Sequence, residues 1–373
     1  MEPIRSLVGA EFPLFAFSHC RDVVAAVSRA GGFGVLGGSS FTPETLEQEL
    51  AWIDAHVDGK PYGVDILIPE HQTLGSDVGI DALLARIPTG HLDFTVDLLA
   101  RHQIKAGRDD VVTRDLPATL PEVGEALMDV AFRHPIRLIV NALGIAPSSM
   151  IARARQAGVP VGALVGAREH AIRQVNAGVD LIVAQGGEAG GHCGEVSTLV
   201  LVPEVIRAIA PIRPVPVLAA GGIMTGGQMA GCMAMGAAGV WTGSVWLATS
   251  EAETGEAFRD KMIAATSRDT IRSPSRTGKP SRQLKSAWHE AWDGPASPGA
   301  LPMPMMSMIS LPTFRAIDKA AESGNAKARE LVSYWVGQGV GLVDSVRSAT
   351  TVVQEFKQDF ADAVGRLVDL AGA

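Results

Sequence analysis

Eight short apolar segments alternate with segments of helical pattern along the chain, and this alternation limits the possible folds more than any other feature. The apolar segments span residues 13–18, 33–37, 62–68, 136–142, 159–165, 179–185, 215–223 and 238–249. Each is mainly apolar, which is typical of parallel strands that are covered on both faces. Eight such strands with helices between them predict a closed (β/α)8 TIM barrel in preference to an open doubly wound sheet.

Two segments fall outside this alternation. Residues 69–121 are polar, with one amphipathic helix around 91–104, and we interpret them as an insertion after strand three. This insertion is expected to act as a lid or a subunit contact, or to be a solvated excursion without function. Residues 270–373 are expected to form a C-terminal loop and helical extension. We treat residues 1–373 as a single domain.

The charge and hydropathy of the chain indicate which kinds of binding partner to expect. The net charge is −8, and no basic run is present that would favour nucleic acid. Residues 214–250 carry no charge but contain many glycines, and their pattern fits a strand, helix and strand better than a membrane span. We therefore expect a small-molecule substrate, no nucleic acid, no membrane partner and a possible homo-oligomer. Three cysteines and the absence of a recognisable leader favour the cytoplasm.

A glycine motif near the start of the chain has the spacing of a dinucleotide-binding fingerprint. Residues 32–37 read GFGVLG and match GxGxxG. In a dinucleotide-binding fold this motif follows a strand and opens a helix. Here it follows a helical pattern and runs into an apolar segment, so the sequence favours a helix-to-strand turn.

Residues 184–194, reading AQGGEAGGHCG, concentrate the reactive side chains of the chain. Four glycines follow the end of a predicted strand, at the edge where α/β proteins place their active sites. Glu188, His192 and Cys193 lie among them. His192 is either a surface histidine of a glycine-rich turn or a catalytic base, since an imidazole with a pKa near ~6.5 can take up a proton at neutral pH.

Two later glycine-containing turns suggest an anion site. Gly221 and Gly222 end predicted strand seven, and Gly243 and Ser244 interrupt the eighth apolar segment. Loops after strands seven and eight of such barrels commonly bind phosphate through backbone N–H groups. The alternative is that these glycines serve only tight packing.

Three further side chains raise alternatives. Asp65 lies among apolar residues of strand three, so its charge should be either paired or functional. The pairs His19-Cys20 and His192-Cys193 could together bind zinc, but adjacent ligands diverge and the spacing is unusual, so we expect no metal. A redox pairing of Cys20 with Cys193 is a further hypothesis.

Five stretches together resemble the nitronate monooxygenase family, also called 2-nitropropane dioxygenases. They are AQGGEAGGHCG, VPVLAAGGIMTGGQMA, GAAGVWTGSVWLAT, SRTGKPSRQLKSAW and YWVGQGVG. The resemblance runs from about residue 13 to residue 341, apart from the insertion. It implies an FMN-dependent (β/α)8 barrel related to flavin enoyl-ACP reductases.

The resemblance also implies roles for individual residues. His192 would be the catalytic base, and the other implied positions would lie against the cofactor. Gln185 would contact the flavin, the Gly190 and Gly191 backbone would approach it, and Gly221, Gly222, Gly243 and Ser244 would hold the FMN phosphate. The chain departs from the family at Asp65, where Asn is common, and at Ala16, Phe17 and Ser18, where an Ala-Pro-Met segment commonly lines the flavin.

Three functions follow from these features. The leading hypothesis is an FMN-dependent oxidoreductase that oxidises a small carbon acid, an alkyl nitronate or nitroalkane, with His192 as general base and oxygen as acceptor. The first alternative is a flavin-dependent NAD(P)H reductase or dehydrogenase acting on an enone, quinone or acyl thioester. The second alternative is a non-catalytic flavin-binding protein.

Overall fold

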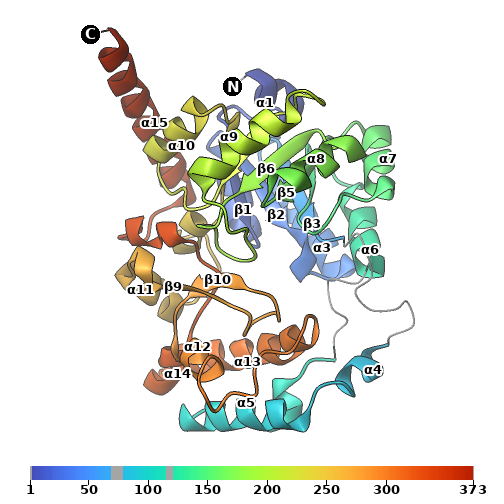
Figure 1. Ribbon diagram of the computed structural model, residues 1–373, viewed down its shortest axis with the longest axis vertical. Helices are drawn as coiled ribbons and strands as arrows, with labels where there is room; N and C mark the ends of the chain where they lie inside the picture. The colour runs from blue at the N-terminus through green and yellow to red at the C-terminus, as the bar shows by residue number, and fades with distance from the viewer. Residues whose placement is uncertain (1, 69–78, 115–120, 373) are drawn as a thin grey trace.

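The computed structural model describes residues 2–68, 79–114 and 121–372, and its centre is a closed barrel of eight parallel strands (Figure 1). Each strand pairs with its neighbours in chain order, and β8 pairs with β1 to close the ring. The predicted (β/α)8 barrel is therefore confirmed. The strands are β1 (Leu14–Ser18), β2 (Phe33–Gly37), β3 (Tyr62–Ile66), β4 (Ile139–Asn141), β5 (Val161–Val165), β6 (Leu181–Gln185), β7 (Val217–Ala220) and β8 (Gly239–Thr242).

The ring of helices around the barrel is closed by the end of the chain. Seven of its helices follow their strands in sequence, but the eighth position, between α10 and α2, is taken by the last helix. The ring consists of α2 (Arg21–Arg29), α3 (Pro43–His56), α6 (Pro121–Ala131), α7 (Ser148–Ala157), α8 (Arg168–Ala177), α9 (Thr198–Ile209), α10 (Gly226–Ala234) and α15 (Ala349–Gly372). Part of the predicted C-terminal extension thus belongs to the barrel itself.

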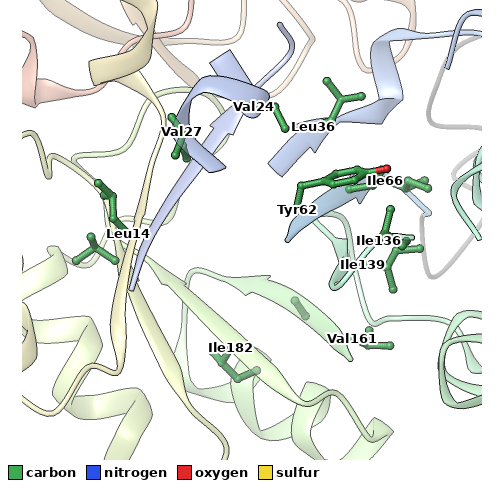
Figure 2. Packing of buried hydrophobic residues seen from close by; sticks show 14 of the residues in the cluster. Leu14, Val24, Val27, Leu36, Tyr62, Ile66, Ile136, Ile139, Val161 and Ile182 are labelled. Atoms are coloured by element: carbon green, nitrogen blue, oxygen red, sulfur yellow. The ribbon is translucent and has the colours of Figure 1, made fainter. Parts of the chain in front are cut away.

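Side-chain alternation along the strands divides the core into two layers. Outward residues such as Leu14, Leu36 and Ile66 pack between the strands and the helices, as Figure 2 shows. Inward residues such as Phe15 and Trp241 fill the barrel. Helix α1 (Glu2–Val8), which the sequence analysis did not predict, contributes apolar side chains to this inner cluster and covers the amino-terminal end of the barrel.

A second group of elements packs together beside the barrel, and we call it the accessory region (residues 79–114 and 250–342). It joins the described part of the insertion to the segment that follows β8, because Leu98 and Leu99 pack in one apolar cluster with Trp288 and Phe314. Its elements are α4 (Ile80–Leu84), α5 (Thr89–Arg101), η2 (Arg108–Val111), α11 (Glu256–Ala264), η4 (Ser267–Asp269), β9 (Thr270–Ser273), β10 (Ser281–Leu284), α12 (Ala287–Trp292), α13 (Met305–Glu322), α14 (Ala326–Leu331) and η5 (Gln338–Leu342).

Some predicted boundaries differ from the structure. The eighth apolar segment is a strand only to Thr242, since Gly243 breaks it and Ser244–Ala248 forms the 3-10 helix η3. The fourth segment gives a strand of three residues. Residues 69–78 and 115–120 of the predicted insertion lie outside the described residues. Within the described chain, no helix combines the length and the apolar character needed to cross a bilayer.

Candidate active site

The loop after β6 is held rigidly at the carboxyl end of the barrel by a β-hairpin of the accessory region. Strands β9 and β10 pair antiparallel, and Gly191 forms a reciprocal backbone bridge with Arg282 of β10. The Arg282 guanidinium also donates from Nε (3.1 Å) and Nη2 (2.7 Å) to the carbonyl of Gly187. The sequence analysis predicted neither strand of this hairpin.

Glu188 has a structural role. Its carboxylate accepts hydrogen bonds from the backbone N–H of Thr198 (2.9 Å) and from the Thr198 hydroxyl (2.9 Å). The same hydroxyl oxygen lies 3.0 Å from the carbonyl of Gly221 at the end of β7. Glu188 therefore joins the β6 loop to α9 and β7, and a carboxylate with these partners is an acceptor and not a proton donor.

His192 lies at the rim of the barrel mouth with a defined tautomer. Its Nδ1 is 3.3 Å from the carbonyl oxygen of Pro280, which can only accept, so the neutral ring carries its proton on Nδ1. Nε2 is then the basic nitrogen. The side chain is exposed to solvent, but nearby protein atoms still lower the pKa of His192 by partial desolvation; the hydrogen bond to Pro280 opposes this, and the charge of Lys279 lowers the pKa again. A neutral imidazole at pH 7 fits a general base.

Residues 336–339 form a wall of the site that the sequence analysis missed. The backbone N–H of Gly337 donates to the Ser244 hydroxyl (2.8 Å), and that of Gln338 donates to the Glu188 carbonyl (2.8 Å). A Cβ on Gly190 would lie 2.8 Å from the Val336 carbonyl carbon. Glycine is thus required at position 190 by the close approach of this segment, which the motif YWVGQGVG could have indicated.

The two turns predicted to bind phosphate present free backbone donors. Gly221 and Gly222 have φ values of +111° and +69°, which favour glycine. Within the described chain, the N–H groups of Gly221, Gly222 and Gly243 donate to no protein acceptor. The space in front of the Gly243 Cα is open, and the Gln228 side chain fixes the β7 turn by donating to the Gly222 carbonyl (3.0 Å). Such amides suit an anionic group.

Two polar side chains point into the barrel mouth from different sides. Val64 and Ile66 face the helices, so Asp65 between them faces inward; Gln185 continues the inward series of β6 after Val183. Within the described residues, no protein group donates to the Asp65 carboxyl or to the Gln185 amide. Asp65 is only 4% exposed, and burial raises its pKa well above the usual range.

The β1 residues predicted to lie near the cofactor, Ala16, Phe17 and Ser18, do not all face the barrel interior. The Phe17 side chain faces inward, whereas the Ala16 side chain is buried against the helices. The Ser18 hydroxyl accepts from the Cys20 backbone N–H (3.1 Å) and so orders the turn into α2. Phe17 is therefore the one of the three whose side chain faces the site.

The cysteines are engaged separately. The Cys20 thiol donates to the carbonyl of Glu251 (3.0 Å), and the Cys193 thiol lies 3.6 Å from the carbonyl of Gly187. Both are free, and burial raises the pKa of each thiol. Over the described residues, His19, Cys20, His192 and Cys193 do not gather as one group of possible metal ligands; Cys20 lies instead with Asp22 and Glu253, whose ligand atoms are within 4.8 Å of one another.

Comparison with known proteins identifies a family that covers most of the chain. The profile of the nitronate monooxygenase family matches residues 16–359. The chain is 54% identical over 372 residues to the Mycobacterium tuberculosis (strain H37Rv) protein Rv1533, named as a monooxygenase, covering 98% of both chains. It is 27% identical to a Staphylococcus aureus (strain MSSA476) protein named as a nitronate monooxygenase, covering 94% of both.

Solved structures share the fold over the same length. A nitroalkane oxidase from Streptomyces ansochromogenes superposes with a TM-score of 0.78 at 25% identity, covering 98% of this chain and 99% of that one. FabK from Thermotoga maritima gives a TM-score of 0.68 at 24% identity, covering 98% of both, and shows the likeness of fold alone. With the family profile spanning most of its length, this chain belongs to the nitronate monooxygenase family of flavin-dependent oxidoreductases.

Proposed function

We propose that this protein uses FMN to oxidise a small carbon acid, an alkyl nitronate or nitroalkane, with His192 as general base and oxygen as the electron acceptor. The observation that carries the proposal is the tautomer of His192, whose Nδ1 donates to the Pro280 carbonyl and whose Nε2 is left as a base in the loop after β6. The family membership supports the same chemistry.

The residues around the mouth fit FMN. The free N–H groups of Gly221, Gly222 and Gly243, with Ser244 beside them, would hold its phosphate. Gln185, Asp65, Phe17 and the backbone near Gly191 would surround its ring, with Gly190 packed behind against Val336 and with Ala16 and Ser18 contributing backbone only. When bound, the flavin would accept the electrons of the oxidised substrate.

The protein's own contribution would be to position the substrate and move one proton. The lowered pKa keeps His192 neutral near pH 7, so Nε2 can remove the acidic proton α to a nitro group. The Pro280 carbonyl would then stabilise the imidazolium through Nδ1. The accessory hairpin holds this geometry by fixing Gly187 and Gly191.

We also propose a cytoplasmic location, a homo-oligomer, and a role for the insertion as a lid or subunit contact. Support for an oligomer comes from apolar side chains at the end of α15, where Leu367, Val368 and Leu370 are 50–76% exposed. Light scattering of the purified protein against a chain that ends at residue 364 tests this: an unchanged mass would remove the support.

The visible spectrum of the purified protein, followed without oxygen, tests the enzymatic proposal. We expect a flavin spectrum that ethyl nitronate or nitroethane bleaches. In His192→Gln, bleaching by neutral nitroethane should be lost while bleaching by the preformed nitronate persists. His170→Gln, on the exposed side of α8, is the matched control. Bleaching by NADH alone would favour a reductase, and absence of flavin would contradict both.

A further inference from the structure

His19, which follows β1, and Asp65 of β3 are both neighbours of Gly37 at the carboxyl end of β2. Gly37 of β2 pairs directly with Asp65 of β3. Neighbouring strands are about 4.8 Å apart. A Cβ on Gly37 would lie 2.6 Å from both Cε1 and Nδ1 of His19, so the imidazole occupies the place of the missing side chain. The ring therefore lies beside the Asp65 side chain.

His19 is a neutral ring in this position. Its Nδ1 is 3.0 Å from the carbonyl oxygen of Gly37, an acceptor, and must carry the proton. The Ser40 hydroxyl lies 3.2 Å from the same nitrogen. Burial lowers the pKa of His19, so the ring has no charge with which to compensate an ionised Asp65. The Phe17 ring packs edge-on against the imidazole, with the two ring centroids 5.1 Å apart.

Asp65 is enclosed without a charged partner. Its titration is governed by burial alone, and no charged group of the described chain acts on it. On β2 the facing position is a glycine covered by His19, and on β4 the paired residue is Val140. An unpaired carboxylate in such surroundings costs far more free energy than a protonated carboxyl. The protonated group is a hydrogen-bond donor with no protein acceptor among the described residues.

We propose that Asp65 is a neutral carboxylic acid that donates a hydrogen bond to negative charge developing on the molecule bound in the barrel mouth. His19 is a positioning residue, because its ring and that of Phe17 keep water from the carboxyl. The inference rests on the proposed function for the identity of the bound molecule. The charge belongs either to an oxygen of the deprotonated substrate or to the reduced flavin, and a neutral donor suits both.

The protonation state can be measured directly on the whole protein. In protein labelled with 13C-aspartate, the Asp65 carboxyl signal, identified by its loss in Asp65→Asn, should have the shift of a protonated acid at pH 7. His19→Ala should move its titration to lower pH by admitting water. Asp109→Asn, which removes an exposed carboxylate, is the control and should leave the signal unchanged. An ionised signal at pH 7 would overturn the proposal.

The donor role is tested with nitrate, a planar anion, titrated by calorimetry into the protein as purified. Asp65→Asn keeps a donor and should bind nitrate as the wild type does, whereas Asp65→Leu should bind it on the order of tenfold more weakly. If the flavin carries the charge instead, nitrate binding stays unchanged. The two-electron reduction potential of the flavin in Asp65→Leu then falls by about 30 mV for each tenfold loss in the preference of the protein for reduced over oxidised flavin.

Unchanged nitrate affinity together with an unchanged potential in Asp65→Leu would refute the donor role. These outcomes are separate from those of the proposed function. Failure of nitronate to bleach the protein would reject the oxidation of a carbon acid and leave the carboxyl signal of Asp65 as it is.

Discussion

At the scale of single residues, neighbouring glycines of the β6 loop are required for different reasons. A Cβ added at Gly190 would lie 2.8–2.9 Å from the Val336–Gly337 backbone, whereas the space in front of Gly191 is open and its φ is +74°. Gly190 is thus fixed by close packing, and Gly191 by its backbone conformation. The motif alone predicts glycine at both positions but cannot tell these causes apart.

This difference gives a paired prediction. Gly190→Ala should lower the free energy of unfolding by about 1–3 kcal/mol, because the added methyl group overpacks the wall at 336–339. Gly191→Ala should cost about 1 kcal/mol, from the left-handed backbone alone. Chemical denaturation and flavin retention measure both. Equal flavin loss in the two variants would contradict the assignment of Gly190 to the wall.

Glu188 and Asp65 show how far single residues can be interpreted from sequence. Both carboxylates were noted as chemically suggestive, but Glu188 is satisfied by Thr198, ten residues later, while Asp65 has no partner in the described chain. Whether such a carboxylate finds a partner depends on how the loops after the barrel strands pack together. The local sequence pattern does not predict this packing.

At the scale of elements, the β9–β10 hairpin supports the loop after β6. Its Arg282 reaches both Gly187, through the guanidinium, and Gly191, through the backbone. The eight barrel strands could be predicted because each is a mainly apolar run. The hairpin could not be predicted, because its strands, TIRS at 270–273 and SRQL at 281–284, are short and polar.

Removal of the Arg282 guanidinium should therefore disturb the loop and spare the barrel. In Arg282→Met we expect the unfolding free energy to fall by about 1–2 kcal/mol and kcat/KM to fall by about tenfold, with flavin retained. Arg268→Met, an exposed arginine in η4, is the control. Steady-state kinetics beside thermal unfolding would detect the effect, and a wild-type kcat/KM would show that the loop holds its place without Arg282.

At the scale of the whole molecule, the accessory region carries its own pH sensitivity. His289 of α12 is 1% exposed, its Nδ1 accepts from the Ser286 N–H (3.1 Å), and burial with the charge of Arg276 lowers its pKa to about 3. The unfolded chain takes up this proton near pH ~6.5. Stability from the neutral ring is therefore complete above that pH and is lost as the pH falls towards 3.

His289→Gln should flatten this dependence. Between pH 7 and 4.5 the wild type should lose about 3 kcal/mol more unfolding free energy than the variant, because pH 4.5 lies two units below the unfolded pKa and each unit corresponds to about 1.4 kcal/mol. His170→Gln, exposed on α8, should behave as the wild type does. Denaturant titrations at the two pH values measure the difference, and parallel wild-type and variant profiles would show that His289 is not the titrating group.

Order along the chain also has a consequence for how the enzyme is made. All eight strands have been synthesised by Thr242, yet the wall against Gly190 and Ser244 comes from residues 336–339, and the eighth helix of the ring only from 349–372. A ribosome-bound chain that has been synthesised to the end of β8 therefore contains every barrel strand but still lacks the segments that complete the site. Cofactor loading is accordingly expected at the end of translation, when residues 336–339 have reached the β6 loop and the last helix has completed the ring.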